Sequence, residues 1–247
     1  MIPKIIHYCW FGRNPLPPLA KECIASWKKY LPDYEIKEWN EDNFDVNMLP
    51  YTKEAYEAKK YAFVSDYARF WILYQYGGLY FDTDVEVIRP MDDIIDRGPF
   101  MGCECNASVS TFPTVAPGLG LGVNSGLELY KEILDLYAGL HFRNVDQTLN
   151  LKTVVEYITE LLCQHGMKNK NEMQKVAGIW IYPKEYFNPF DMMNNRLNVT
   201  RKTVSIHHYA GSWLPYSQKL KKKLIKVLGH KLTSFIVKVK HKIRYRK

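Results

Sequence analysis

The sequence is short of cysteine, and the cysteines it has form no recognisable framework. Five occur in 247 residues, an odd number without the regular spacing of a disulfide-bonded scaffold. Cys103 and Cys105 lie too close together for the usual zinc-binding pair, and no second pair follows them. The sequence therefore predicts five free thiols in a reducing compartment: Cys9, Cys23, Cys103, Cys105 and Cys163.

Long apolar runs are missing too. No stretch approaches the roughly 20 residues that a transmembrane helix needs. The opening residues, Met-Ile-Pro-Lys-Ile-Ile-His-Tyr, contain no apolar segment followed by a small-residue cleavage site. We therefore expect a cytoplasmic protein, with a peripheral position on the inner face of the plasma membrane as the alternative.

Acidic residues are absent from the last part of the chain. Residues 219–247 hold twelve Lys or Arg and no Asp or Glu, whereas the remaining residues hold 22 basic and 26 acidic side chains. We therefore divide the chain into an α/β domain over residues 1–215 and a basic tail over residues 216–247. This asymmetry indicates a surface-binding tail rather than a nucleic-acid-binding fold.

The basic tail also has an apolar stripe at helical spacing. A basic amphipathic helix commonly lies on anionic lipid, so a membrane surface is the partner that we favour. The alternatives are a helix packed on the domain with a solvated basic face, or a nucleic-acid patch. The stripe consists of Leu220, Leu224, Ile225, Val227, Leu228, Leu232, Phe235 and Ile236.

Helix and strand patterns alternate through the first hundred residues. Residues 4–11 and 34–39 look like strands and residues 19–30 like a helix. A long helical stretch over 53–76 should end at Gly77-Gly78, and residues 79–88 read as a further strand. With 47% hydrophobic residues, this alternation predicts a layered α/β fold with a sizeable core.

Two aspartates, Asp82 and Asp84, interrupt the apolar strand predicted over residues 79–88. Side chains two residues apart on a strand face the same way, so the two carboxylates would crowd one side. Like charges so placed need a cation, or one of them must be protonated. A hard divalent ion such as Mn²⁺ or Mg²⁺ suits carboxylate ligands, so we predict a metal site here.

A second polar pair, Asp66 and Arg69, lies in the otherwise apolar helix predicted over residues 53–76. Buried charges are costly unless they are paired or bound to something. At a spacing of three the two side chains can meet on one helix face. They form either a self-satisfied ion pair in the core or a binding site, in which Asp66 accepts hydrogen bonds from sugar hydroxyls and Arg69 holds a phosphate or orients Asp66.

Together these segments resemble a known family. Val64-Ser-Asp-Tyr-Ala-Arg69 followed by Tyr76-Gly-Gly-Leu-Tyr-Phe-Asp-Thr-Asp84 is similar to the sugar-binding region containing a D-x-D motif of the family 32 glycosyltransferases. The opening Ile2-Pro-Lys-Ile-Ile-His-Tyr-Cys-Trp-Phe-Gly12 and the later His207-His-Tyr-Ala-Gly-Ser-Trp213 fit the same family. The bacterial members of this family include enzymes of capsular-polysaccharide synthesis, and the clostridial glucosylating toxins share a similar core.

The resemblance implies a GT-A fold: a single Rossmann-like nucleotide-sugar-binding domain with a mixed central sheet and helices on both faces. It also implies that Asp82 contacts the ribose or shares a metal ion that Asp84 ligates directly. Of the two histidines His207 and His208, we choose His208 to complete the metal ligands. Asp66 and Arg69 would hold the donor sugar, and we count them with Asp84 as catalytic.

Three further residues receive substrate-binding roles from the resemblance. Trp10 would stack on the nucleotide base, although a plain core aromatic is the alternative for this residue. Ser212 and Trp213 would contact the diphosphate from a closing loop.

The resemblance therefore implies an enzyme, a metal-dependent, retaining glycosyltransferase that uses Mn²⁺ or Mg²⁺. It would move a sugar from a UDP- or GDP-sugar to a glycan or lipid-linked acceptor in surface polysaccharide synthesis, and nucleic acid is not an expected partner. The alternatives are a non-catalytic nucleotide-sugar-binding module and a membrane-surface adaptor that acts through the basic tail.

Overall fold

The computed structural model describes residues 1–108, 111–191 and 196–211. These residues fall into two compact units. The main unit comprises residues 1–189 and 199–208. In the smaller unit, strands β10 (Phe190–Asp191) and β11 (Arg196–Leu197) pair antiparallel. The predicted basic tail, together with Ser212 and Trp213, lies outside the described residues.

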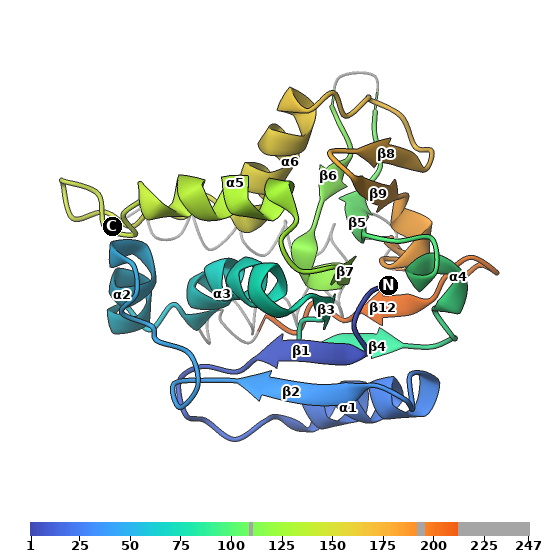
Figure 1. Ribbon diagram of the computed structural model, residues 1–247, viewed down its shortest axis with the longest axis horizontal. Helices are drawn as coiled ribbons and strands as arrows, with labels where there is room; N and C mark the ends of the chain where they lie inside the picture. Colours follow the sequence, from blue (N-terminus) through green and yellow to red (C-terminus); the bar gives the residue numbers. More distant parts are fainter. Residues whose placement is uncertain (109–110, 192–195, 212–247) are drawn as a thin grey trace, which may run out of the picture. The chain divides into compact units, whose positions relative to one another are not determined.

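The main unit is built on a mixed sheet in the order β2-β1-β3-β7-β5-β9-β8, with β6 paired to β5 (Figure 1). The pairs β1–β2, β1–β3 and β5–β9 are parallel, and the others are antiparallel. The strands are β1 (Ile5–Cys9), β2 (Glu35–Trp39), β3 (Gly78–Tyr80), β5 (Phe100–Cys105), β6 (Thr114–Val115), β7 (Leu121–Val123), β8 (Gln174–Val176) and β9 (Ile179–Tyr182).

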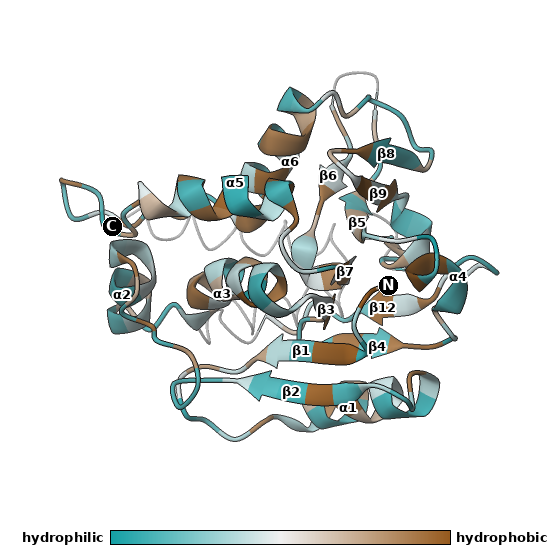
Figure 2. Ribbon diagram, viewed as in Figure 1, coloured by the Kyte–Doolittle hydropathy of each residue, from teal (hydrophilic) through white to brown (hydrophobic). Residues whose placement is uncertain are grey.

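Helices cover both faces of this sheet because successive strand residues point to opposite sides. Tyr80 packs into a core shared with α3, α5 and α6, whereas its neighbours Leu79 and Phe81 pack into a second core shared with α1 and α4. Apolar and polar positions alternate along α5, as expected for a helix with one buried face (Figure 2). The helices are α1 (Pro18–Tyr30), α2 (Pro50–Glu57), α3 (Tyr61–Tyr76), α4 (Asp92–Ile95), α5 (Glu128–Ala138) and α6 (Val154–Gln164), with 3₁₀ turns at Pro117–Leu119 and Lys184–Tyr186. The predicted α/β class is confirmed.

The long helix predicted over residues 53–76 is two helices, α2 and α3. The break occurs at Lys59, which adopts a positive φ of 56°, and the Lys60 amide reaches back to the Ala55 carbonyl oxygen at 2.9 Å. The predicted end of the second helix is confirmed, because Gly77 follows α3 with φ 65°.

The prediction of a single strand over residues 79–88 is also wrong. It is divided into β3 and β4 (Val85–Val87), and β4 leaves the main sheet to pair with β12 (Ser205–His207). The Val85 amide donates to the Asp82 carbonyl oxygen at 3.0 Å, so the two aspartates lie on a turn. Asp and Thr suit such a turn because their short polar side chains can satisfy local backbone groups.

None of the helices within the described residues is long and apolar enough to cross a membrane.

Candidate active site

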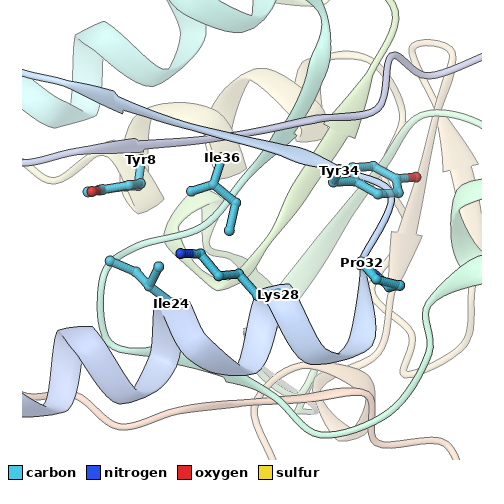
Figure 3. Close-up of a pocket in the computed structure, with 6 residues that line it drawn as sticks. All are labelled: Tyr8, Ile24, Lys28, Pro32, Tyr34 and Ile36. Atoms are coloured by element: carbon cyan, nitrogen blue, oxygen red, sulfur yellow. The ribbon is translucent and has the colours of Figure 1, made fainter.

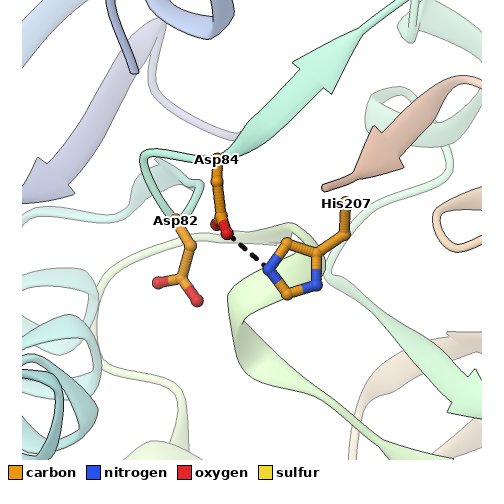
Figure 4. A group of neighbouring side chains, drawn as sticks. All are labelled: Asp82, Asp84 and His207. Carbon is orange, nitrogen blue, oxygen red and sulfur yellow. Dashed lines mark hydrogen bonds and ion pairs between the residues drawn. The ribbon is translucent and has the colours of Figure 1, made fainter. Parts of the chain in front are cut away.

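The turn between β3 and β4 brings two carboxylates to an imidazole from far along the chain. β12 runs antiparallel to β4 with His207 opposite Val85, so His207 lies beside the turn (Figure 4). Its Nε2 is 3.0 Å from Asp84 Oδ1, and one ligand atom from each of Asp82, Asp84 and His207 lies within 4.8 Å of the others. The side chains of Asp84 and His207 are 17% and 14% exposed. These three residues, called here the acidic triad, form a half-buried group with two negative charges.

The acidic triad has the chemistry of a site for a divalent cation. Carboxylate oxygens together with an imidazole nitrogen suit Mn²⁺, whereas Mg²⁺ is bound mainly through carboxylate oxygens. Burial alone would lower the pKa of His207, but the hydrogen bond and charge of Asp84, together with the charges of Asp82 and Glu104, leave that pKa above its ordinary value. A metal ion bound here would offset the charge of the two carboxylates and take the imidazole as a neutral ligand.

This geometry places His207, and not the predicted His208, beside the two aspartates. Adjacent residues direct their side chains to opposite sides of an extended chain. His208 therefore points away from the triad, and its Nε2 lies 2.9 Å from Glu86 Oε2. This second pair is more exposed, at 33% and 42%.

Arg69 links the triad to α3. Its Nη2 lies 2.9 Å from Asp66 Oδ1 and 3.2 Å from Asp82 Oδ1, and the side chain is only 4% exposed. Its Nε donates to the Ser65 carbonyl oxygen at 3.2 Å, and its guanidinium lies 5.0 Å from the centre of the Tyr80 ring. The guanidinium is therefore enclosed by groups of the chain itself. Of the two roles predicted for Arg69, orienting carboxylates is the one that this geometry supports.

Asp66 lies deeper than Asp82. Its side chain is 13% exposed, and burial raises its pKa to about 7, with the charge of Arg69 acting in the opposite direction. For Arg69, burial alone would lower the pKa, but Asp82 and the other surrounding groups hold it above its ordinary value. The pair predicted from a spacing of three thus exists, and Arg69 shares its charge between it and the triad.

Gly118 is a site residue that the sequence reasoning missed. The Asp82 amide donates to the Gly118 carbonyl oxygen at 3.1 Å. A Cβ atom at position 118 would lie only 1.9 Å from Asp82 Oδ2. The glycine-rich composition of residues 100–126 was the available signal, but composition does not say which glycine faces the site.

Trp10 lies at the same edge of the sheet as Asp82. β1, β2 and β3 are parallel, so their carboxyl ends, and the residues that follow them, share one edge. Trp10 comes directly after β1, is half-buried, and donates from Nε1 to the Asn14 carbonyl oxygen at 2.5 Å. It is therefore not a fully enclosed core aromatic.

A pocket elsewhere contains none of the predicted site residues. It lies between α1 and the strands β1 and β2, and it encloses about 490 Å³ (Figure 3). Its lining residues are Tyr8, Ile24, Lys28, Pro32, Tyr34 and Ile36.

Comparison with known families finds a match that includes α3 and the turn between β3 and β4. Residues 17–101 match the family described as "Glycosyltransferase sugar-binding region containing DXD motif". The match includes Asp66, Arg69, Asp82 and Asp84, while Trp10 and His207 lie outside it. It confirms the expected resemblance to D-x-D glycosyltransferases over about a third of the chain.

Curated relatives match a similar share of the chain. "Inositol phosphoceramide mannosyltransferase 1" of Schizosaccharomyces pombe is 28% identical over 111 residues, 40% of this chain and 33% of that protein. "Inositol phosphoceramide mannosyltransferase 3" of the same organism is 34% identical over 98 residues, 38% of this chain and 27% of that protein. "Uncharacterized glycosyltransferase L373" of Acanthamoeba polyphaga mimivirus is 32% identical over 106 residues, 40% and 42% of the two chains. The chain thus spans about a third of the length of the S. pombe relatives.

A solved structure supports the fold over more of the chain. A glycosyltransferase "involved in the glycosylation of the major capsid of PBCV-1" aligns with 88% of this chain and 97% of its own, with a TM-score of 0.51 and 12% identity. The mixed sheet with helices on both faces is the GT-A fold, as predicted.

Proposed function

We propose that the protein is a metal-dependent glycosyltransferase that moves a sugar from a nucleoside-diphosphate donor to a hydroxyl of its acceptor. The observation that carries this proposal is the acidic triad at the carboxyl edge of the parallel strands in a GT-A fold. Ligands of open α/β sheets bind outside the carboxyl ends of the strands. The family match covers the two aspartates of the triad and the helix that braces them.

Asp82, Asp84 and His207 would hold the divalent ion. A bound Mn²⁺ or Mg²⁺ supplies positive charge to the diphosphate as the bond to the sugar breaks. Arg69 keeps Asp82 in place through its 3.2 Å contact, and it also orients Asp66. Asp66 contacts Arg69 through Oδ1. Its carboxylate would also accept hydrogen bonds from hydroxyls of the donor sugar. A preorganised group of this kind needs no rearrangement during the reaction.

The base and the diphosphate would be bound by other segments. Trp10, half-buried at the same edge as Asp82, is suited to stack on the nucleotide base. Ser212 and Trp213, proposed on the sequence resemblance alone, would contact the diphosphate. Retention of the anomeric configuration is proposed on the same ground.

The donor and acceptor are proposed at a coarser level. Two relatives are named as mannosyltransferases acting on a lipid, inositol phosphoceramide. This supports a mannosyl donor and a lipid-linked acceptor as first candidates, within the broader UDP- or GDP-sugar class. A cytoplasmic protein that binds the inner membrane surface through residues 219–247 would meet such an acceptor, and capsular polysaccharide synthesis is one pathway that would use it.

The test is donor turnover by the purified chain. A panel of UDP- and GDP-sugars, GDP-mannose included, is incubated with Mn²⁺ or with a chelator, and nucleoside diphosphate release is measured. Asp84→Asn removes one charged ligand, and Asp135→Asn is the matched control because Asp135 lies exposed on α5 and pairs only with Lys131 among the contacts of the described residues. We expect release from one donor that needs Mn²⁺, persists in the control and is lost in Asp84→Asn.

Two results would contradict the proposal. Turnover that survives both the chelator and Asp84→Asn would exclude the triad from the reaction. Metal-dependent nucleotide binding without turnover, with acceptor lipids and glycans supplied, would favour the non-catalytic nucleotide-sugar-binding module.

A further inference from the structure

Two loops meet at the edge of the sheet where Trp10 lies. The loop after β1, residues 10–14, is called here the Trp10 loop. It runs beside residues 40–42, which follow β2, and the Trp10 amide donates to the Trp39 carbonyl oxygen at 2.8 Å. Both loops follow parallel strands, so both face the region in which a ligand of this fold binds.

Glu41 joins these two loops to α2. Its Oε1 accepts a hydrogen bond from the Gly12 amide at 2.6 Å and another from the Tyr56 hydroxyl at 2.8 Å. Its Oε2 is buried and has no hydrogen-bond partner among the described residues. Burying an unsatisfied carboxylate oxygen is unfavourable, so the contacts made through Oε1 must offset this cost. The Glu41 side chain thus links the Trp10 loop to α2 through a single oxygen atom.

Gly12 is held from its other side by an aromatic ring. Its φ is +96°, a conformation that suits glycine, and a Cβ atom there would lie 2.3 Å from Tyr61 Cε2. The Tyr61 ring therefore packs directly against the Gly12 main chain, while the Gly12 amide points to Glu41. The peptide is fixed between a hydrogen-bond acceptor and a ring.

The position of Gly12 determines the position of the Trp10 indole. Asn14 Nδ2 donates to the Gly12 carbonyl oxygen at 3.0 Å, and the Trp10 indole Nε1 donates to the Asn14 carbonyl oxygen at 2.5 Å. A displaced Gly12 would therefore carry Asn14 and the indole with it.

We infer that Glu41 is a positioning residue that holds the Trp10 loop in the shape that receives the base of the donor nucleotide. This inference rests on the proposed function, because it gives the indole its ligand. Fixing a loop before binding raises affinity, since the ordering cost is not incurred when the ligand arrives. Only the accepting geometry of Oε1 is required, so a glutamine, whose amide oxygen accepts both hydrogen bonds, should replace it.

The experiment compares Glu41→Ala, Glu41→Gln and Asp42→Ala. Asp42 is the matched control because it lies in the same loop and also bridges to the Trp10 loop, but its contact with Arg13 is a 2.7 Å ion pair with both side chains more than 60% exposed. Titration calorimetry gives the dissociation constants of UDP and GDP at saturating Mn²⁺. Electron paramagnetic resonance gives the affinity for Mn²⁺ alone, which depends on the triad and not on the Trp10 loop.

We expect Glu41→Ala to weaken nucleotide binding at least tenfold and to leave Mn²⁺ affinity within twofold. Glu41→Gln and Asp42→Ala should bind nucleotide within about threefold of the parent. Nucleotide affinity in Glu41→Ala equal to the parent would overturn the inference, as would Glu41→Gln falling as far as Glu41→Ala. A parent that binds no nucleotide would refute the proposed function and this inference with it, a result distinct from any difference between variants.

Discussion

Gly118→Ala is predicted to damage the metal site without unfolding the protein. The new Cβ atom would lie 1.9 Å from Asp82 Oδ2, whereas such contacts essentially never fall below 3.0 Å. The Asp82 carboxylate must therefore move by at least about 1 Å. This displacement damages the site because metal–ligand distances tolerate changes of only about a few tenths of an ångström. The atom that moves is the end of a side chain, so the backbone can stay in place.

The two consequences differ in size. Mutating a group that orients a metal ligand typically lowers metal affinity about 10- to 100-fold, and displacing Asp82 itself should lower Mn²⁺ affinity at least as far. Stability should change little. Replacing a glycine at a compatible backbone position stabilises by roughly 0.4–1 kcal/mol through the unfolded state. This gain offsets part of the cost of weakening the contact between Asp82 and Arg69.

The assay is a Mn²⁺ titration of the parent, Gly118→Ala and Gly139→Ala, with a urea denaturation curve for each. Gly139 is the matched control because a Cβ atom there would meet only one backbone oxygen, at 3.7 Å. Parent-like Mn²⁺ affinity in Gly118→Ala would refute the placement of Asp82 at the metal. A large loss of stability in that variant would refute the argument that only the side chain moves.

Three further predictions concern single side chains. Arg69→Met leaves the largely buried Asp66 and the half-buried Asp82 without their cation and should cost about 3–5 kcal/mol in urea denaturation. The cost should be larger at pH 8 than at pH 5, because Asp66, with a pKa of about 7, is protonated at the lower pH. A cost under about 1 kcal/mol at pH 8 would contradict the prediction. His207→Ala should lower Mn²⁺ affinity about 10- to 100-fold. His208→Ala should bind Mn²⁺ like the parent, because the His208–Glu86 pair is exposed and lies apart from the acidic triad. Equal losses of Mn²⁺ affinity in the two variants would contradict the assignment of His207 to the metal site. Burial lowers the pKa of His7 to about 4, below its unfolded value of 6.5. The folded protein should therefore lose about 3 kcal/mol of unfolding free energy as the pH falls from 6.5 through 4, because the unfolded state binds the proton more readily. Urea denaturation across this range should show that loss in the parent and not in His7→Gln, and identical pH dependence of the two would refute the prediction.

Local patterns predicted the elements that carry the site. The strand ending near Trp10 and the helix ending at Gly77 follow from apolar periodicity and glycine chemistry, and both are present. Asp66 and Arg69 pair as their spacing predicted. These features depend on residues close together in the sequence.

Features set by distant contacts were beyond the reach of such patterns. The strand predicted over residues 79–88 divides because β4 pairs with β12, which lies about 120 residues later, rather than with the main sheet. The same pairing selects His207 over His208, since register decides which side chain faces Asp84. The close approach of Gly118 to Asp82 likewise depends on how a loop returns to the sheet.

The most direct test of the account is the stoichiometry of Mn²⁺ binding, measured by electron paramagnetic resonance with UDP or GDP present. We predict one Mn²⁺ per chain in the parent and in Asp135→Asn, bound more tightly when the matching nucleotide is present, and at least tenfold weaker Mn²⁺ binding in Asp84→Asn. A parent that binds no Mn²⁺ with either nucleotide, or an Asp84→Asn variant that binds it as tightly as the parent, would contradict the claim that the acidic triad holds the catalytic ion.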